Sequence, residues 1–298
     1  MRLSIVLGEW LDRPVAADLA VAELADQLGY GEVWIGEMAK LDAPAMAATI
    51  VGRTSSIEPC LGPLAVTVRS PAQIALAVAT IAATGRTCHV ALGTSSTTVA
   101  RWHGTTRAGA ADRLARATAD VQALLRGERV NGFLLREVPH GATVTVAAFG
   151  ERALGIAATA DRMVLNMVTP ATAAKLSVWH ANTAVWLAAA IDPTPEERRW
   201  LALGYVGYLA APGYAEMFSE AGFDQLVEFA RTRPHPKELA ARIPDELLEA
   251  VALVGTEADV RRRIDEYAAA GIREIGLVVP PLDLGCGRRT IEALAPAS

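Results

Sequence analysis

The residues best suited to chemistry are the neighbours Trp102, His103 and Gly104. An imidazole titrates near neutral pH, so His103 could donate or accept a proton, and Trp102 could form an aromatic wall beside it. A lone histidine is also often structural, and both interpretations stay open. Glu37 follows the apolar run 33–35. Its carboxylate could hydrogen-bond a ligand, or it could be a solvated loop residue or a helix cap.

Two polar segments could bind a polar or anionic ligand. Thr94, Ser95 and Ser96 follow a glycine at the end of an apolar run, and they offer hydroxyls and backbone N–H groups. The segment Phe149-Gly150-Glu151-Arg152 joins a strand-like run to a helix-like run, so its free N–H groups could receive a phosphate. Arg152 would add positive charge there, and Glu151 would oppose it. A common serine-rich loop and a plain turn are the alternatives.

The remaining histidines and the cysteines do not form metal-site patterns. His89, His140, His180 and His235 lack the i, i+4 or H-x-E spacing with carboxylates that zinc enzymes use. The three cysteines are far apart and include no C-x-x-C pair. We therefore expect no metal, no disulfide framework and a reducing cytoplasm.

The elements that must position these residues begin with residues 59–104. This stretch contains a strand-like run at 60–68, a helix-forming run at 72–84 and a second strand at 87–92. Two strands joined by a crossover helix run parallel, and a parallel sheet places its ligand loops at the carboxyl ends of the strands. The loops at Gly62-Pro63 and at residues 93–96 are therefore expected to lie at one edge of the sheet.

Eight such strands are expected along the chain. Their centres are Leu3, Val33, Leu61, Val90, Val144, Val164, Val185 and Ile275. Eight strand–helix units in 298 residues predict a single-domain (β/α)₈ TIM barrel, with residues 105–142 and 204–252 as insertions. An open doubly wound sheet is the alternative, but no G-x-G-x-x-G follows the first strand. Asn166 would then end the sixth strand and is a lesser candidate for the binding site.

The composition excludes several classes of function. The chain has 28 Lys and Arg against 33 Asp and Glu, a formal charge of −5, and its basic residues are scattered. We therefore expect no nucleic-acid partner and no anionic-membrane surface. The apolar residues form no uncharged run of about twenty and no signal peptide, so a soluble cytoplasmic protein is expected.

Five segments in register resemble the bacterial luciferase-like monooxygenase superfamily. They are GYGEVWIGEM, GPLAVTVRSPAQIA, GRTCHVALGTSS with RWHG after it, AAFGERALGIAATADRMVLN, and VGTEADVRRRIDEYAAAGIREIGL. Together they span nearly the whole chain. Within the superfamily, the chain is most similar to the actinobacterial branch that uses the deazaflavin coenzyme F420 rather than FMN.

The resemblance implies an elongated deazaflavin or flavin at the carboxyl ends of the barrel strands, usually in a homodimer. The family often has a cis peptide and a bulge in its third strand, which maps near Gly62-Pro63-Leu64, and a proline there lowers the cost of a cis bond from about 3 to about 0.5–1 kcal/mol. Several F420 enzymes have a catalytic histidine directly after the position of Glu37, where this chain has Met38. The implied cofactor-binding residues are Gly62, Pro63, Thr94, Ser95, Ser96, Trp102, Phe149, Gly150, Glu151, Arg152 and Asn166, and the implied catalytic residues are Glu37 and His103.

The expected activity is hydride transfer between F420 and a small organic substrate, such as an enone-like acceptor or, in reverse, an alcohol. Arg69, Arg101 and Arg107 are candidates for the acidic tail of F420, or they are surface residues. The alternatives are an FMN-dependent monooxygenase and a cofactor-free barrel with a binding role. A metal-dependent barrel hydrolase is disfavoured, because the histidines and carboxylates do not cluster.

Overall fold

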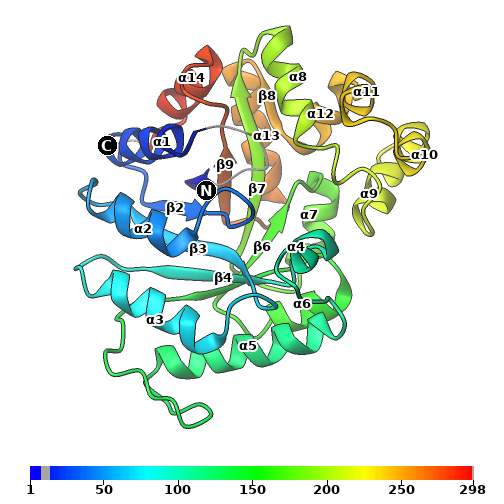
Figure 1. Cartoon of the computed structure of the whole chain (residues 1–298). Helices are drawn as coiled ribbons and strands as arrows, with labels where there is room; N and C mark the ends of the chain where they lie inside the picture. Colours follow the sequence, from blue (N-terminus) through cyan, green and yellow to red (C-terminus); the bar gives the residue numbers. More distant parts are fainter. Residues whose placement is uncertain (8–13, 297–298) are drawn as a thin grey trace.

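A computed structural model of the protein describes residues 1–7 and 14–296. Within these ranges, eight parallel strands form a closed barrel (Figure 1). The barrel strands are β1 (Arg2–Leu7), β2 (Glu32–Ile35), β3 (Glu58–Ala65), β4 (His89–Gly93), β5 (Val144–Ala147), β6 (Arg162–Asn166), β7 (Thr183–Ile191) and β9 (Glu274–Val278). Neighbours in the chain pair from β1 to β7, and β9 pairs with both β7 and β1. Each predicted strand centre lies in one of these strands, so the (β/α)₈ barrel is confirmed and the open-sheet alternative is wrong.

The helices on the outside of the barrel follow the strands. They are α1 (Val15–Gln27), α2 (Ala43–Val51), α3 (Pro71–Ala82), α5 (Ala110–Leu125), α6 (Glu151–Ala157), α7 (Pro170–Ser177), α13 (Glu257–Ala269) and α14 (Gly285–Ala293). Helix α3 shows why the sequence folds this way: Ser70 caps it by accepting the N–H of Gln73, and Pro71 fits its first turn. The apolar faces of the helices and the outward side chains of the strands form one large core.

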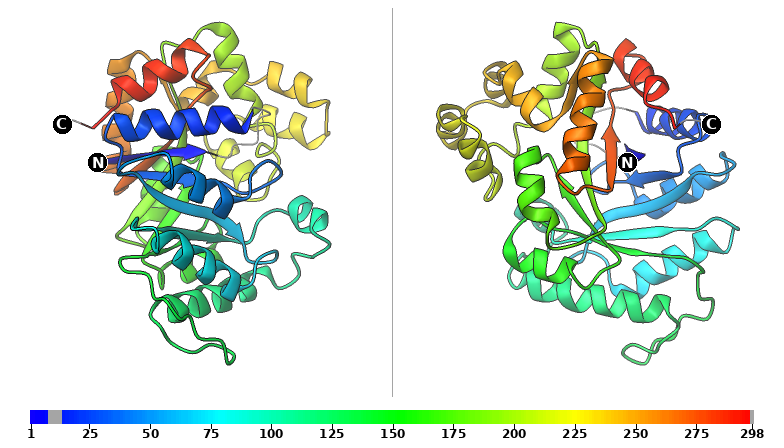
Figure 2. Two further views of the ribbon diagram at one scale, coloured as in Figure 1. Left: turned by 60° about the vertical axis from the view of Figure 1, so that its left-hand side comes forward. Right: turned by 180° about the vertical axis from the view of Figure 1, so that it is seen from behind.

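Several elements differ from the sequence prediction. The helical region expected at 195–231 consists of α8 (Pro195–Leu203), α9 (Tyr214–Glu220) and α10 (Asp224–Arg231), followed by α11 (Pro236–Ala241) and α12 (Asp245–Val251). Helices α9 to α11 lie to one side of the barrel (Figures 1 and 2). A short strand, β8 (Leu253–Gly255), pairs in parallel with the last three residues of β7. The weak hairpin expected at 130–139 is reduced to one bridge between Val130 and Phe133.

Helices α4 (Thr97–Trp102) and α14 were not predicted. Helix α14 contains two glycines in its first turn, which lower helix propensity. Gly287 is nevertheless required, because an added Cβ would lie 2.3 Å from the carbonyl oxygen of Pro280. Glycine is therefore needed at this position so that the helix can pack closely on the segment that follows β9.

An ionic network fills the barrel interior near the amino ends of the strands. Arg162 donates to both carboxylate oxygens of Glu32, at 2.6 and 2.9 Å, and to Glu274 at 2.8 Å. The indole N–H of Trp34 donates to Ser4 and Glu274, both at 3.0 Å. Burial opposes ionisation of Glu274, but the guanidinium groups of Arg162 and Arg2, together with the hydrogen bonds from Ser4 and Arg2, outweigh it, so the pKa of Glu274 lies below its usual value. These side chains are almost completely buried, and they seal this end of the barrel.

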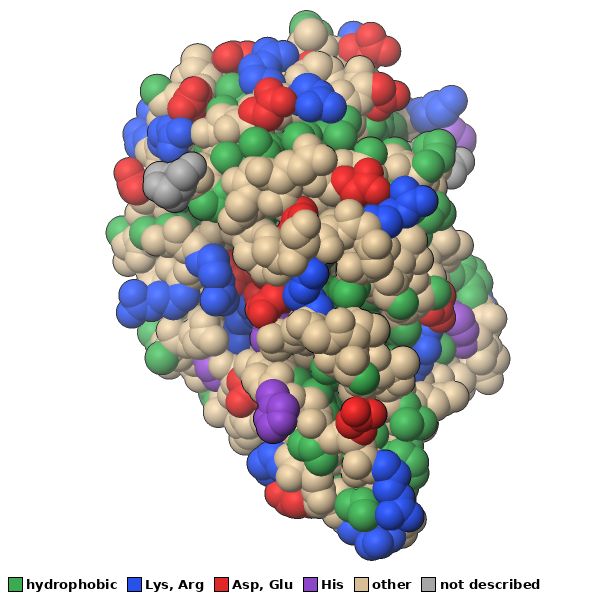
Figure 3. All heavy atoms as spheres, turned by 90° about the vertical axis from the view of Figure 1, so that its left-hand side faces the viewer, with side chains coloured by type: hydrophobic (Ala, Val, Ile, Leu, Met, Phe, Trp, Pro, Cys, Tyr) green, Lys and Arg blue, Asp and Glu red, His purple; other side chains and the backbone are tan. Residues whose placement is uncertain are grey.

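The surface carries charges of both signs. Figure 3 shows one face of the molecule, on which Lys and Arg side chains occur together with Asp and Glu side chains. No helix within residues 1–7 and 14–296 is both long enough and apolar enough to cross a membrane.

Candidate active site at the mouth of the barrel

Trp186 forms the floor of the open end of the barrel. Its ring contacts the fully buried Trp34 edge to face, with centroids 5.4 Å apart and planes at 81°. Trp34 in turn lies against the guanidinium of Arg162, at 4.1 Å from the ring centroid. The three side chains make a column along the barrel interior, and Trp186, which is partly exposed, is its member nearest to the carboxyl ends.

Gly276 makes room for this indole. It pairs in register with Trp186 across β7 and β9. A Cβ added at Gly276 would lie 2.7 Å from Cδ1 of Trp186 and 2.8 Å from Cγ2 of Val6. Only glycine fits there while the indole keeps its position. The Nε1–H of Trp186 is buried and has no hydrogen-bond partner among the described residues. An unpaired buried donor costs about 1–3 kcal/mol.

Small side chains surround the mouth above this floor. Strand residues alternate between the two faces of the barrel wall, and the inward positions at the carboxyl ends are Pro63, Gly93, Ala147, Asn166, Ala188 and Val278. All of them except Gly93 are partly exposed, so solvent reaches the barrel interior from this end. A Cβ added at Gly93 would lie 3.3 Å from Cβ of Pro63 and 3.6 Å from Cβ of Ala147. The mouth is therefore lined mostly by small apolar residues, and Gly93 keeps the space between Pro63 and Ala147 free of a side chain.

The third strand contains the bulge and the cis peptide that the resemblance implied. The register of β3 against β4 shifts between Leu61 and Leu64, and the Gly62–Pro63 bond is cis. Gly62 has φ +102°, a conformation that favours glycine, and an added Cβ would lie 2.1 Å from the backbone nitrogen of Leu64. The bulge brings Pro63 against Gly93 at the rim of the mouth.

Glu37 is held in an ion pair beside the mouth. Both of its carboxylate oxygens accept hydrogen bonds from Arg69, at 2.7 Å each, and one also accepts the N–H of Ala43 at 2.9 Å. Arg69 also donates to Asp42. The hydrogen bonds with Glu37 raise the pKa of Arg69 further above its usual value. Glu37 thus ties the loop after β2 to the loop after β3, and its catalytic role stays a prediction.

Trp102 and His103 lie at the surface. Helix α4 stands out from the barrel (Figure 2, left), and Trp102, its last residue, is 53 % exposed. His103 follows the helix and is also exposed. The structure does not bring either side chain against the mouth, and their predicted roles remain predictions.

The hydroxyls after β4 have defined partners. Ser96 caps α4 by accepting the N–H of Val99 at 3.2 Å, and Ser95 adopts a left-handed φ of +56°. Thr94 directly follows Gly93 and accepts a hydrogen bond from Nη2 of Arg107 at 2.9 Å. Of the three hydroxyl residues, Thr94 is closest in the chain to the mouth, and the guanidinium of Arg107 is its neighbour there.

The turn after β5 contacts the insertion. Phe149 stacks on Tyr214 of α9 with ring centroids 4.5 Å apart, and Tyr214 is hydrogen-bonded to Asn166. Gly150 precedes α6, Glu151 is exposed, and Arg152 forms an exposed ion pair with Asp112 at 2.5 Å. The charge that Arg152 was expected to offer to a phosphate is therefore already paired.

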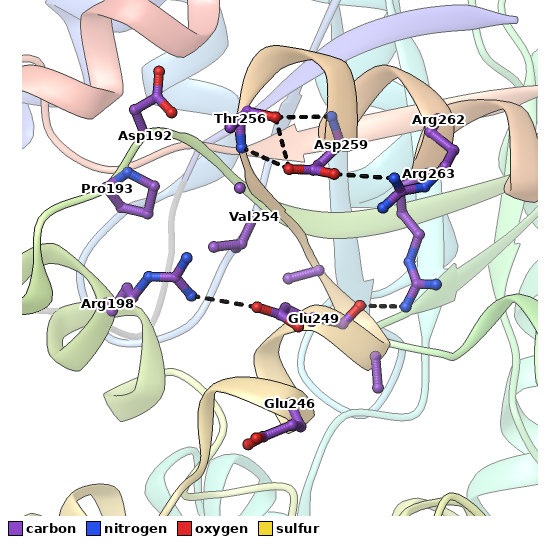
Figure 4. A pocket seen from close by; sticks show the side chains of 13 residues that line it. Asp192, Pro193, Arg198, Glu246, Glu249, Val254, Thr256, Asp259, Arg262 and Arg263 are labelled. Carbon is purple, nitrogen blue, oxygen red and sulfur yellow. Dashed lines mark hydrogen bonds and ion pairs between the residues drawn. The ribbon is translucent and has the colours of Figure 1, made fainter.

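A hollow of about 820 Å³ lies elsewhere, beyond the ends of β7 and β8 (Figure 4). Its lining is charged, and the charges face each other: Arg262 donates to Asp259 at 3.0 Å, and Arg198 lies 3.9 Å from Glu249. None of the residues predicted for the site lines it. The apolar, partly exposed mouth fits a flat organic ligand better.

Sequence reasoning missed Trp186 and Gly276, although it found Pro63 and Asn166. The sequence TAVWLAAAI places a tryptophan between alanines at alternate positions, which is a signal for a large side chain in a narrow barrel. Its partner glycine is recognisable only from the strand register. Among the described residues, no three His, Cys, Asp or Glu side chains come together as a metal site requires.

Comparisons with known proteins agree with this architecture. The family model described as luciferase-like monooxygenase matches residues 8–274. Similar solved structures include the coenzyme F420 dependent tetrahydromethanopterin reductase from Methanopyrus kandleri, at 15 % identity and a TM-score of 0.79, covering 99 % of this chain and 97 % of that one. An F420-dependent secondary alcohol dehydrogenase in complex with an F420-acetone adduct has 16 % identity and a TM-score of 0.76, with 99 % of both chains covered.

A flavin enzyme has the same fold. The oxygenating constituent of 3,6-diketocamphane monooxygenase from Pseudomonas putida, in complex with FMN, has 15 % identity and a TM-score of 0.69, covering 99 % of this chain and 97 % of that one. At these identities the solved structures establish the fold alone. No curated protein matches the sequence.

Proposed function

The chain belongs to the luciferase-like monooxygenase family, a family of oxidoreductases, and we propose that it is an F420-dependent oxidoreductase that transfers a hydride between the deazaflavin and a small organic substrate. The observation that carries this proposal is the mouth of the barrel: an apolar rim of small residues above the indole of Trp186. A flat tricyclic ring needs such a surface. The F420 enzymes of the same fold support the choice of cofactor.

The residues present fit a deazaflavin or flavin ring. Gly93 leaves open a space next to Pro63 and Ala147 that a side chain would fill, and the bulge at Gly62-Pro63 forms one side of the rim. When bound, F420 would supply the hydride. The residues of the chain would orient the ring, exclude water from its buried face and leave its other face open to the substrate. The lack of charge among the inward mouth residues favours a neutral substrate, such as an enone or a secondary alcohol.

The second candidate is an FMN-dependent monooxygenase, because an FMN enzyme shares the fold. The same mouth would hold either ring. Titration of the purified protein with F420 and with FMN, followed by absorbance, separates the two. We expect F420 to bind at micromolar or lower concentration. Tight binding of FMN without binding of F420 would support the monooxygenase, and binding of neither would support a cofactor-free barrel.

A matched pair of variants locates the ring. The sequence contains six tryptophans, so a two-dimensional NMR spectrum shows six indole N–H signals that single Trp-to-Phe variants assign. W186F removes the signal of the floor, and W179F removes that of an exposed residue just before β7, at the opposite end of the barrel. Cofactor binding should shift the Trp186 signal and leave the Trp179 signal in place. A shift of the Trp179 signal alone would place the ring elsewhere.

We further propose that the protein is a cytoplasmic homodimer and that it acts on a small molecule.

A further inference from the structure

Arg107 is an exposed arginine at the edge of the mouth, and it forms no ion pair with any residue in the ranges 1–7 and 14–296. The chain leaves β4 at Gly93, forms α4 and returns toward α5 (Figure 1). On this return, Arg107 donates from Nη2 to the hydroxyl of Thr94 at 2.9 Å. Thr94 is the residue after Gly93, which lies between Pro63 and Ala147 in the rim. The guanidinium is thus fixed one hydrogen bond away from the first residue beyond the mouth.

Two of the other arginines considered for an anion are already paired with carboxylates. Arg69 is neutralised by Glu37 and Asp42, and Arg152 is paired with Asp112. Among the described residues, no carboxylate lies within ion-pair distance of Arg107. Its contact with Thr94 uses one of five N–H donors. The remaining donors keep the planar fork that binds phosphate oxygens in pairs.

From this geometry we propose that Arg107, anchored by Thr94, binds the phosphate that follows the ribityl chain of the cofactor. The inference rests on the proposed function, since it requires a ring at the mouth. It replaces Arg152 with Arg107 as the source of positive charge. FMN and F420 share this phosphate next to the ribityl group, so the same residue serves either cofactor. The glutamyl tail of F420 extends beyond the phosphate and does not need Arg107.

One ligand pair isolates the phosphate, and a second pair tests the phosphate together with the tail of F420. FMN and riboflavin share one ring and differ in the phosphate, and F420 is compared with its riboflavin-like deazaflavin fragment, which lacks the phosphate and the tail. Each ligand is titrated into wild type, R107M and R116M. The R116M control removes an equal charge from an exposed arginine of α5. In wild type, we expect the phosphate to tighten binding, and the ratio of the two dissociation constants to fall as salt is added.

In R107M, the advantage of FMN over riboflavin should fall by about 10- to 100-fold, the usual weight of a hydrogen bond to a charged group. Riboflavin itself should bind as in wild type, and R116M should keep the full advantage of FMN over riboflavin. T94V should lose a smaller part of the advantage of FMN over riboflavin, because the guanidinium of Arg107 loses its hydrogen bond to Thr94 but keeps its charge.

Three outcomes would overturn the proposal. The advantage of the phosphate could persist in R107M, or R116M could lose as much as R107M. Riboflavin could also weaken in R107M by the same factor as FMN, which would indicate a purely structural role. If wild type binds none of the four ligands, the proposed function fails as well. Binding in wild type with no selective loss in R107M refutes only the role of Arg107.

Discussion

Substitution of Gly276 by alanine should disturb both stability and ligand binding at the mouth. The new Cβ would lie 2.7 Å from Cδ1 of Trp186 and 2.8 Å from Cγ2 of Val6. The indole must then move by about 0.8 Å to reach an ordinary carbon–carbon contact of about 3.5 Å. Overpacking of this kind costs about 1–3 kcal/mol in the free energy of unfolding. The lower conformational entropy of alanine in the unfolded chain offsets part of this cost. We expect a net loss of about 1–2 kcal/mol.

Urea unfolding followed by circular dichroism measures this loss, with G155A as the control. Gly155 lies in α6, is exposed and has nothing within 4 Å of an added Cβ, so G155A should be stabilised by about 0.5–1 kcal/mol. The G276A variant should also shift the indole N–H signal of Trp186 and bind cofactor more weakly. A G276A protein with wild-type stability and an unmoved Trp186 signal would show that Gly276 does not position the floor.

Three further predictions concern the barrel itself. Arg162→Met leaves the buried Glu32 without its cation and leaves Glu274 with Arg2 alone, so it should cost about 3–5 kcal/mol in urea unfolding at pH 7. Arg152→Met, in an exposed pair, should change stability by less than about 1 kcal/mol, and equal losses would contradict the network. Because the pKa of Glu274 is lowered in the folded state, its contribution to stability is present above its ordinary pKa of 4.5 and is lost as the pH falls through the folded-state pKa. The free energies of unfolding of wild type and Arg162→Met should therefore converge in acid, and a constant gap would count against this. Gly62→Ala would place a Cβ 2.6 Å from the carbonyl oxygen of Ala91 and should destabilise the protein and abolish cofactor binding; a stable variant with normal binding would argue against the bulge as part of the site.

The strands were predictable because their burial on both faces produces short apolar runs, such as Val33-Trp34-Ile35, between turn residues. Helix α14 was not, because packing of Gly287 on Pro280 overrides the low helix propensity of glycine.

The candidate site was predictable only in part. Positions at strand ends, including Pro63 and Asn166, follow from the strand count. The pairing of Gly276 with Trp186 depends on register, which no local pattern specifies. Exposure of Trp102 depends on how α4 leaves the barrel, and the neutralisation of Arg69 depends on two carboxylates from a different loop.

The ionic network beneath Trp34 makes the barrel a cup rather than a tube. With Arg162, Glu32 and Glu274 closing one end, every molecule that reaches Trp186 has to enter and depart through the same opening. A cofactor resting on the indole would then be covered by whatever binds second. Two ligands that share one opening cannot exchange independently. We therefore expect ordered binding, in which the ligand that binds last leaves first.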